Sequence, residues 1–141
     1  MKVRNIAYNL CWLAIGIVMV GCTDNSGKFV ITENRKIPAC GIEDPLTQVD
    51  WLAEYCKKHT PTNFTGITIS IDVYVNKITA ENHYVMNYTN SEVVEYSSQE
   101  VYDCSGKKMF LKAKDDLAPA GWTEFFAANT LVATIWEIKK E

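Results

Sequence analysis

Length, composition and charge limit this chain to a small acidic protein. It has 141 residues, with 14 lysines and arginines against 17 aspartates and glutamates, and a formal net charge of −3. Such a charge repels phosphate backbones, and no cluster of basic and aromatic residues offsets it, so the sequence argues against nucleic-acid binding.

The N-terminus has the layout of a secretory signal. Lys2 and Arg4 precede a mostly apolar segment, residues 10–20, which is shorter than the roughly 20 residues of a membrane-spanning helix. The segment ends in Gly21-Cys22, and a small residue followed by cysteine is typical of the lipobox of bacterial lipoproteins, in which the cysteine is acylated and becomes the first mature residue. We therefore expect a signal peptide at 1–21 and a lipid anchor on Cys22, which would bind the protein to a membrane. The alternatives are an ordinary cleaved signal and an uncleaved N-terminal anchor.

Cleavage before Cys22 would leave 120 residues, with 12 basic and 17 acidic side chains and a net charge of −5. That length is enough for one domain with a core but not for two. Residues 22–36 are mostly polar and predict a tether, and residues 37–141 predict the single domain. The short apolar segment 29–32 inside the tether could still pair with the edge of a sheet.

Residues 44–59 predict one amphipathic helix. Asp44 is a candidate N-cap, and Pro45 suits the first helical position, where a missing N–H costs nothing. An apolar stripe at helical spacing follows, made of Leu46, Val49, Leu52, Ala53 and Cys56. Basic residues at 57–59 suit the C-terminal end of the helix dipole, and Thr60-Pro61 ends the helix.

Beyond Gly66 the apolar period changes from helical to alternating. Residues 67–75 place Ile and Val on one face and polar residues with Tyr74 on the other, which predicts a half-buried strand. Residues 82–88 and 92–104 predict the next two strands, and a turn at Ser105-Gly106 leads into a further one. A short helical stretch at 121–129 precedes a last strand at 130–140, in which residues 132, 134, 136 and 138 alternate against 131, 133 and 135.

Together these elements predict an α+β domain. Its antiparallel sheet would have about four to five strands packed on one main helix, with a short second helix before the last strand. Because the strands are apolar on one side only, the main helix is expected to cover one sheet face. Tyr74 lies opposite the Ile and Val face, and Tyr74 and Tyr84 are candidates for a face that contacts a protein or a glycan. His83 is expected to be an exposed surface histidine.

Cys40, Cys56 and Cys104 remain once the signal and the anchor are set aside. Outside the cytoplasm a disulfide is the default expectation. Cys40 lies in a loop and Cys104 at a turn, where the backbone can adjust to disulfide geometry, whereas Cys56 lies on the apolar stripe of the helix. These positions favour Cys40–Cys104, with Cys56–Cys104 as the alternative.

The sequence offers little catalytic or metal-binding chemistry. A structural zinc site needs four ligands, and Cys56 with His59 is the one close Cys/His pair. The G-x-S-x-G elbow is absent, and so is a Gly-rich phosphate loop. We therefore expect no cofactor, no metal and no enzymatic activity. The alternative is a small thiol or hydrolase enzyme that combines Cys56 or Cys104 with His59 or His83.

Several short motifs resemble those of small uncharacterised lipoproteins of Bacteroides-like bacteria, a domain of unknown function. The matching residues are Cys40, Gly41, Pro45, Leu46, Trp51 and Leu52, followed by Asp103, Cys104, Ser105 and Gly106. The resemblance spans most of the mature chain and implies a location in the cell envelope and a similar fold. The expected function is that of a membrane-anchored envelope lipoprotein with a non-enzymatic binding domain; the alternative is a structural accessory subunit of an outer-membrane assembly.

Overall fold

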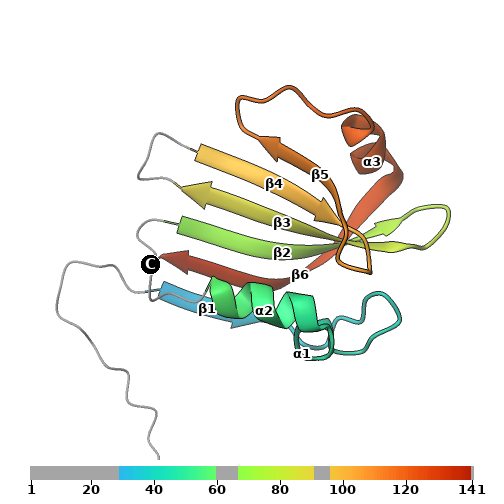
Figure 1. Ribbon diagram of the computed structural model, residues 1–141. Coiled ribbons are helices and arrows are strands. Elements are labelled where there is room, and N and C mark those ends of the chain that lie inside the picture. The colour runs from blue at the N-terminus through green and yellow to red at the C-terminus, as the bar shows by residue number, and fades with distance from the viewer. Residues whose placement is uncertain (1–28, 60–66, 91–95, 141) are drawn as a thin grey trace, which may run out of the picture.

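The computed structural model describes residues 29–59, 67–90 and 96–140 (Figure 1). The expected signal peptide at 1–21, the expected anchor Cys22 and the first part of the expected tether lie outside these ranges. Among the helices within them, none is long and apolar enough to cross a membrane.

A six-stranded antiparallel sheet forms the centre of the described structure (Figure 1). Its strands are β1 (Phe29–Glu33), β2 (Ile67–Asn76), β3 (Asn82–Asn90), β4 (Tyr96–Tyr102), β5 (Lys108–Ala113) and β6 (Asn129–Lys140). Their order across the sheet is β1-β6-β2-β3-β4-β5. The four strands from β2 to β5 form a meander, as predicted, and β6 returns to pair with the free side of β2.

The sheet is larger than the predicted four to five strands because β1 adds an outer edge. Phe29–Glu33 pairs antiparallel with β6, so the apolar segment inside the expected tether is part of the fold. Strand β1 therefore begins at Phe29, eight residues before the expected start of the domain at 37.

The predicted main helix is two helices, α1 (Pro45–Gln48) and α2 (Asp50–Lys58). Val49 separates them with an extended backbone, φ −104° and ψ 104°, and its side chain is buried in the core. Asp44 is the N-cap of α1 and Pro45 follows it, as predicted, but the Asp44 side chain makes no capping hydrogen bond; its carbonyl accepts the N–H groups of Thr47 and Gln48. The short second helix is present as α3 (Trp122–Ala128).

Each sheet face has its own apolar cluster, which we call the α2 face and the α3 face. The α2 face carries the larger cluster, with Leu46, Val49 and Leu52 of the helical segment packed against buried side chains of β2, β3 and β6. The α3 face carries a smaller one, made of Val85, Val101, Trp122 and Phe125. The expectation that the strands are apolar on one side only is therefore wrong where α3 packs. Figure 1 shows α1 and α2 beside β1 and β6, and α3 beside β5 at the other edge.

Strand β6 departs from simple alternation. Its pairing with β2 shifts register between Ile71 and Asp72, where Ile71 faces Trp136 and Asp72 faces Thr134. The extra residue is Ile135, and both Ile135 and Trp136 are buried in the cluster of the α2 face. The predicted separation of 135 from 136 onto opposite faces fails here because a bulge places two successive side chains on one side.

Candidate functional site

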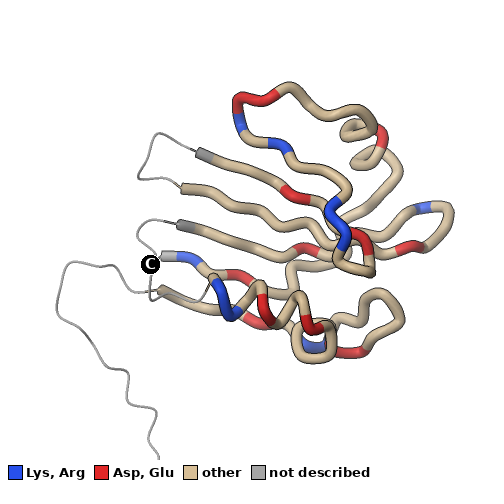
Figure 2. The backbone as a smooth tube through the Cα atoms, in the orientation of Figure 1, with Lys and Arg blue, Asp and Glu red and all other residues tan. Residues whose placement is uncertain are grey.

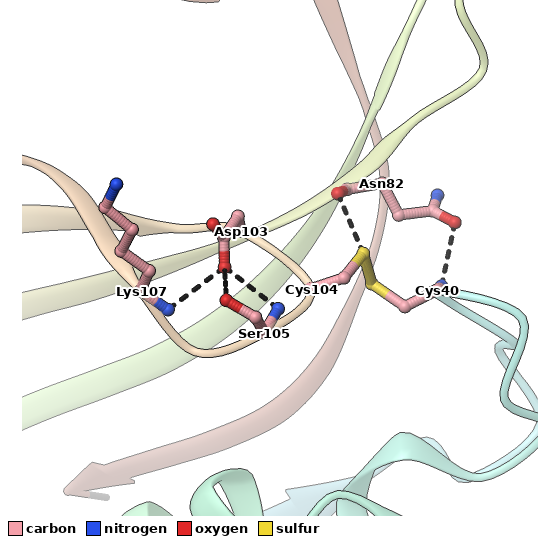
Figure 3. The surroundings of a disulfide bond; sticks show 6 residues. All are labelled: Cys40, Asn82, Asp103, Cys104, Ser105 and Lys107. Carbon is pink, nitrogen blue, oxygen red and sulfur yellow. Dashed lines mark hydrogen bonds between the residues drawn. A yellow bond between two sulfur atoms is a disulfide. The ribbon is translucent and has the colours of Figure 1, made fainter.

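The disulfide joins Cys40 to Cys104, as the sequence favoured, with Cα atoms 5.6 Å apart (Figure 3). Asn82 lies against both cysteines: its Oδ1 accepts the Cys40 N–H at 2.9 Å, and its carbonyl oxygen lies 3.2 Å from Cys104 Sγ. The bond ties the loop before α1 to the turn after β4. It therefore holds the helical segment across the α2 face.

The turn that carries Cys104 is organised by Asp103. One carboxylate oxygen accepts the Ser105 hydroxyl at 2.6 Å, the Ser105 N–H at 2.9 Å and the Lys107 N–H at 3.0 Å (Figure 3). The hydrogen bond from the Ser105 side chain is the main cause that lowers the pKa of Asp103. Gly106 completes the turn with φ +85°, and a Cβ there would lie 2.8 Å from the Trp51 indole. The Trp51 indole therefore packs directly against Gly106, and the role of this turn is structural.

A cleft of about 310 Å³ lies on the α2 face between the end of α2 and strands β3 to β5. Its carboxylate, Glu100, accepts Lys108 Nζ at 2.7 Å and the Tyr102 hydroxyl. The His59 ring stacks 4.1 Å from the Tyr55 ring, and burial raises the pKa values of Tyr55 and Tyr102 above their ordinary range. The hydrogen-bonding capacity of Glu100 is thus largely used within the cleft.

The α3 face carries a row of hydrogen-bonded polar side chains across four adjacent strands. We call Thr134, Asp72, Asn87 and Gln99 the polar row. Thr134 Oγ1 donates to Asp72 Oδ1 at 2.6 Å, and Asn87 Nδ2 donates to Asp72 Oδ2 at 2.7 Å. Gln99 Nε2 then donates to Asn87 Oδ1 at 2.7 Å. Strand pairing produces this row, because Thr134 faces Asp72 and Asn87 faces Gln99 in register.

Aromatic rings stand at one end of the polar row. Tyr74, Trp122 and Phe126 line a hollow of about 390 Å³ together with Gln99 and Thr123. A second hollow, of about 250 Å³, runs along β3, β4 and β5 and is also lined by Asn87 and Gln99. Both hollows are lined by Gln99, and we call them together the α3-side groove. Aromatic rings line one end of this groove, and mostly polar side chains line the rest.

The two tyrosines proposed for a contact face lie on opposite sides of the sheet. Tyr74 lines the α3-side groove and is half-buried. Tyr84 is 0% exposed and belongs to the core of the α2 face, because it pairs in register with Val73. The sequence-based assignment of Tyr84 to the contact face is therefore wrong.

His83 is buried, at 8% exposure, and its ring lies 5.1 Å from that of Phe125. Strand parity correctly places it opposite Tyr84, but α3 covers that part of the sheet, so the predicted surface histidine is wrong. The sequence prediction also missed Asp72, Asn87 and Gln99. A signal exists in the polar positions that alternate with Ile and Val in β2, but the pairing register that unites them is not visible locally.

The thiol groups named for an enzyme are not set up as nucleophiles. Cys104 is bonded to Cys40. Burial, with a further contribution from the charge of Glu33, raises the pKa of Cys56 to about 12, so its thiolate is scarce at neutral pH. In the described part of the chain, no group of three or more His, Cys, Asp and Glu residues could hold a metal ion.

No family model, no curated protein and no solved structure matches this chain.

Proposed function

We propose that this protein is a lipid-anchored lipoprotein of the bacterial cell envelope that binds a ligand, without catalysis, through the α3-side groove. The observation that carries this proposal is the polar row beside the ring-lined hollow. Its amide, hydroxyl and carboxylate groups are held by one another before any ligand arrives, which lowers the entropic cost of binding.

The chemistry of the groove suits binding more than reaction. Its lining supplies amides, hydroxyls, aromatic rings and Lys112. Pockets that mix aromatic walls with a few placed polar groups are typical of ligand sites. The cleft on the α2 face is a weaker candidate, because Lys108 and Tyr102 already occupy the carboxylate of Glu100.

Three features support the envelope location. Residues 1–21 have the layout of a secretory signal and are followed directly by Cys22. The Cys40–Cys104 disulfide is of a kind that persists in oxidising compartments outside the cytoplasm. Both bonded cysteines also lie in the motifs that resemble the small Bacteroides-like lipoproteins.

The anchor is tested by Cys22→Ser. The variant should lose metabolic labelling with a fatty-acid analogue and leave the membrane fraction for the soluble one, because no acyl chain can be attached. The matched control is Cys11→Ser, which changes a cysteine inside the expected signal and should keep both labelling and membrane association. A Cys22→Ser chain that is still processed and membrane-bound would contradict the lipoprotein assignment.

The binding face is tested by photo-crosslinking in cells that produce the full chain. A benzophenone amino acid at Thr123 stands at the α3-side groove, and the same group at Thr47 of α1 is the matched control, since both threonines are exposed. We expect an adduct at 123 and none at 47. No adduct at 123, or equal adducts at both positions, would contradict binding through this groove.

A further inference from the structure

The polar row has a fixed direction that starts at Asp72. An ionised carboxylate only accepts hydrogen bonds, so Asn87 must turn its NH2 group toward Asp72, as the 2.7 Å contact has it. Asn87 Oδ1 is then directed toward β4, and Gln99 must donate a hydrogen bond to it from its own NH2 group. The orientation of both amides therefore follows from the charge of one residue.

This direction decides what Gln99 presents to the groove. One of its amide hydrogens is used on Asn87, which leaves Oε1 and the second amide hydrogen as an adjacent acceptor and donor. Gln99 lines both hollows of the groove, beside Trp122 in one and beside Lys112 in the other. A ligand at this point meets a donor–acceptor pair held in a single orientation.

The ring-lined end offers a complementary apolar surface. The Phe126 ring lies 5.5 Å from Tyr74 and 4.9 Å from Trp122, with both pairs inclined. Tyr74 and Phe126 are half-buried, so part of each ring faces outward. A sugar ring matches such a site, because one side of it is a patch of C–H groups and its rim carries hydroxyls that both donate and accept.

We infer that the α3-side groove binds a hydroxyl-rich oligosaccharide. One sugar ring packs against the outward parts of the Tyr74 and Phe126 rings, beside the largely buried Trp122, and its hydroxyl groups bond to Gln99. Asp72 is a positioning residue that acts through Asn87 to orient the Gln99 amide. This inference rests on the proposed binding function and adds the class of ligand.

The arrangement suits a glycan better than a protein partner. Protein interfaces place apolar side chains at the centre and polar ones at the rim. Here the polar row crosses the middle of the sheet and the aromatic rings stand at one end. Negative charge is sparse at the groove, since β3 has no charged residue and β2 has Asp72 alone (Figure 2), while the lining adds the cations Lys112 and Lys114. The Gln99 amide, which can both donate and accept, suits the hydroxyls of a sugar.

The experiment screens the full chain, in detergent micelles, against immobilised gluco-, manno-, galacto- and xylo-oligosaccharides and their uronic-acid counterparts. Binding to one or more of these is expected, and the affinity for the strongest is then measured by titration calorimetry. Gln99→Ala should weaken it about tenfold, the effect of losing one or two hydrogen bonds. The matched control Gln48→Ala removes an exposed glutamine from α1 and should leave the affinity unchanged.

A double-mutant cycle tests the positioning role of Asp72. Asp72→Asn makes the start of the row ambiguous, because an amide can donate as well as accept, and should weaken binding several-fold in the otherwise unchanged protein. In the Gln99→Ala background the same change should have no further effect, since its action passes through Gln99. Equal losses in both backgrounds would contradict positioning and indicate a structural role; unchanged thermal unfolding midpoints would show that both variants are folded.

The photo-adduct at residue 123 separates failure of this inference from failure of the proposed function. We expect the adduct to contain carbohydrate, detected by periodate oxidation and hydrazide labelling. A protease-sensitive adduct without carbohydrate, together with no binding on the glycan panel, would overturn the glycan inference and leave a binding function standing for a protein partner. The absence of both an adduct and panel binding would overturn the two proposals together.

Discussion

The two faces of the sheet are made by the same strands and are covered differently. On the α2 face, Ile69, Ile71 and Val73 are 0% exposed under the helical segment, and a disulfide fastens that segment. On the α3 face the alternate positions of the same strand are Ser70, Asp72 and Tyr74, and a seven-residue helix covers one end only. Alternation along β2 therefore places a covered row of apolar side chains on the α2 face and, on the α3 face, a row that a helix covers only in part, where ligand binding is proposed.

The largest expected effect is that of removing the disulfide, which holds the helical segment on the α2 face. Replacing Cys40 and Cys104 together with Ala should lower the free energy of unfolding by about 4 kcal/mol, the loop-entropy value for a sequence separation of 64. Urea unfolding followed by tryptophan fluorescence measures this. Dithiothreitol should destabilise the original protein and leave the stability of the double variant unchanged. Equal stability of the original protein with and without the reductant would contradict a stabilising role of the disulfide.

The second prediction compares one core side chain from each face. Leu52→Ala removes a side chain with 0% exposure from the α2 face and should cost about 3 kcal/mol. Phe126→Ala removes a half-buried ring from the α3 face and should cost about half as much, because less apolar area leaves the solvent on folding. Urea midpoints of both variants test this, and equal costs would mean that the α3 face is as tightly packed as the other.

The third prediction uses two glycines near the disulfide. Gly106→Ala combines a positive φ with a Cβ only 2.8 Å from the Trp51 indole and should cost about 2 kcal/mol. Gly41→Ala is the matched control: it has φ +73° but nothing within 4 Å of its Cβ, so about 1 kcal/mol of backbone strain is expected. If the two variants unfold at the same urea concentration, the closure of Trp51 over the turn does not contribute to stability.

The smallest expected effect is a dependence of the free energy of unfolding on pH, which arises from two side chains of the α2 face. Burial raises the pKa of Cys56 and of Tyr84 to about 12 each, from ordinary values of 9.0 and 10.0. The folded protein then holds protons that the unfolded chain releases, so the free energy of unfolding should fall as pH rises above about 9.

The reactivity of the Cys56 thiol can also be measured directly, by alkylation with iodoacetamide. Alkylation at pH 8 should be slow in the native protein and fast after urea is added, as followed by peptide mass spectrometry. Rapid modification without urea would mean that the thiol on this face is reactive, and would revive a thiol enzyme.

Local patterns predicted those parts of the structure that depend on neighbours in sequence. The alternation of β2, the meander and the short helix α3 all follow from residues within one element or one turn. The Cys40–Cys104 bond was favoured on similar grounds, because both cysteines lie where the backbone can move.

Long-range pairing decided what the sequence could not show. The bulge at Ile135 exists only in relation to β2, and Val49 leaves the helix because its side chain enters a core built from distant strands. The polar row likewise needs Thr134 of β6 beside Asp72 of β2, 62 residues away. His83 and Tyr84 were misplaced for the same reason, since the covering of each sheet face is a property of the assembled fold.

The position of β1 sets how far the domain could stand from a bilayer. If Cys22 bears the lipid, only six residues lie between it and Phe29, and even fully extended the seven residue steps from Cys22 to Phe29 span only about 25 Å. Phe29 pairs with Lys140 at one end of β6, whereas Tyr74 pairs with Leu131. The nine residue steps from Leu131 to Lys140 measure about 30 Å. An anchor so short would hold the Phe29 end of the sheet near the lipid headgroups, while the Tyr74 end of the groove would lie farther along the strands, where a ligand could approach with little obstruction from the membrane.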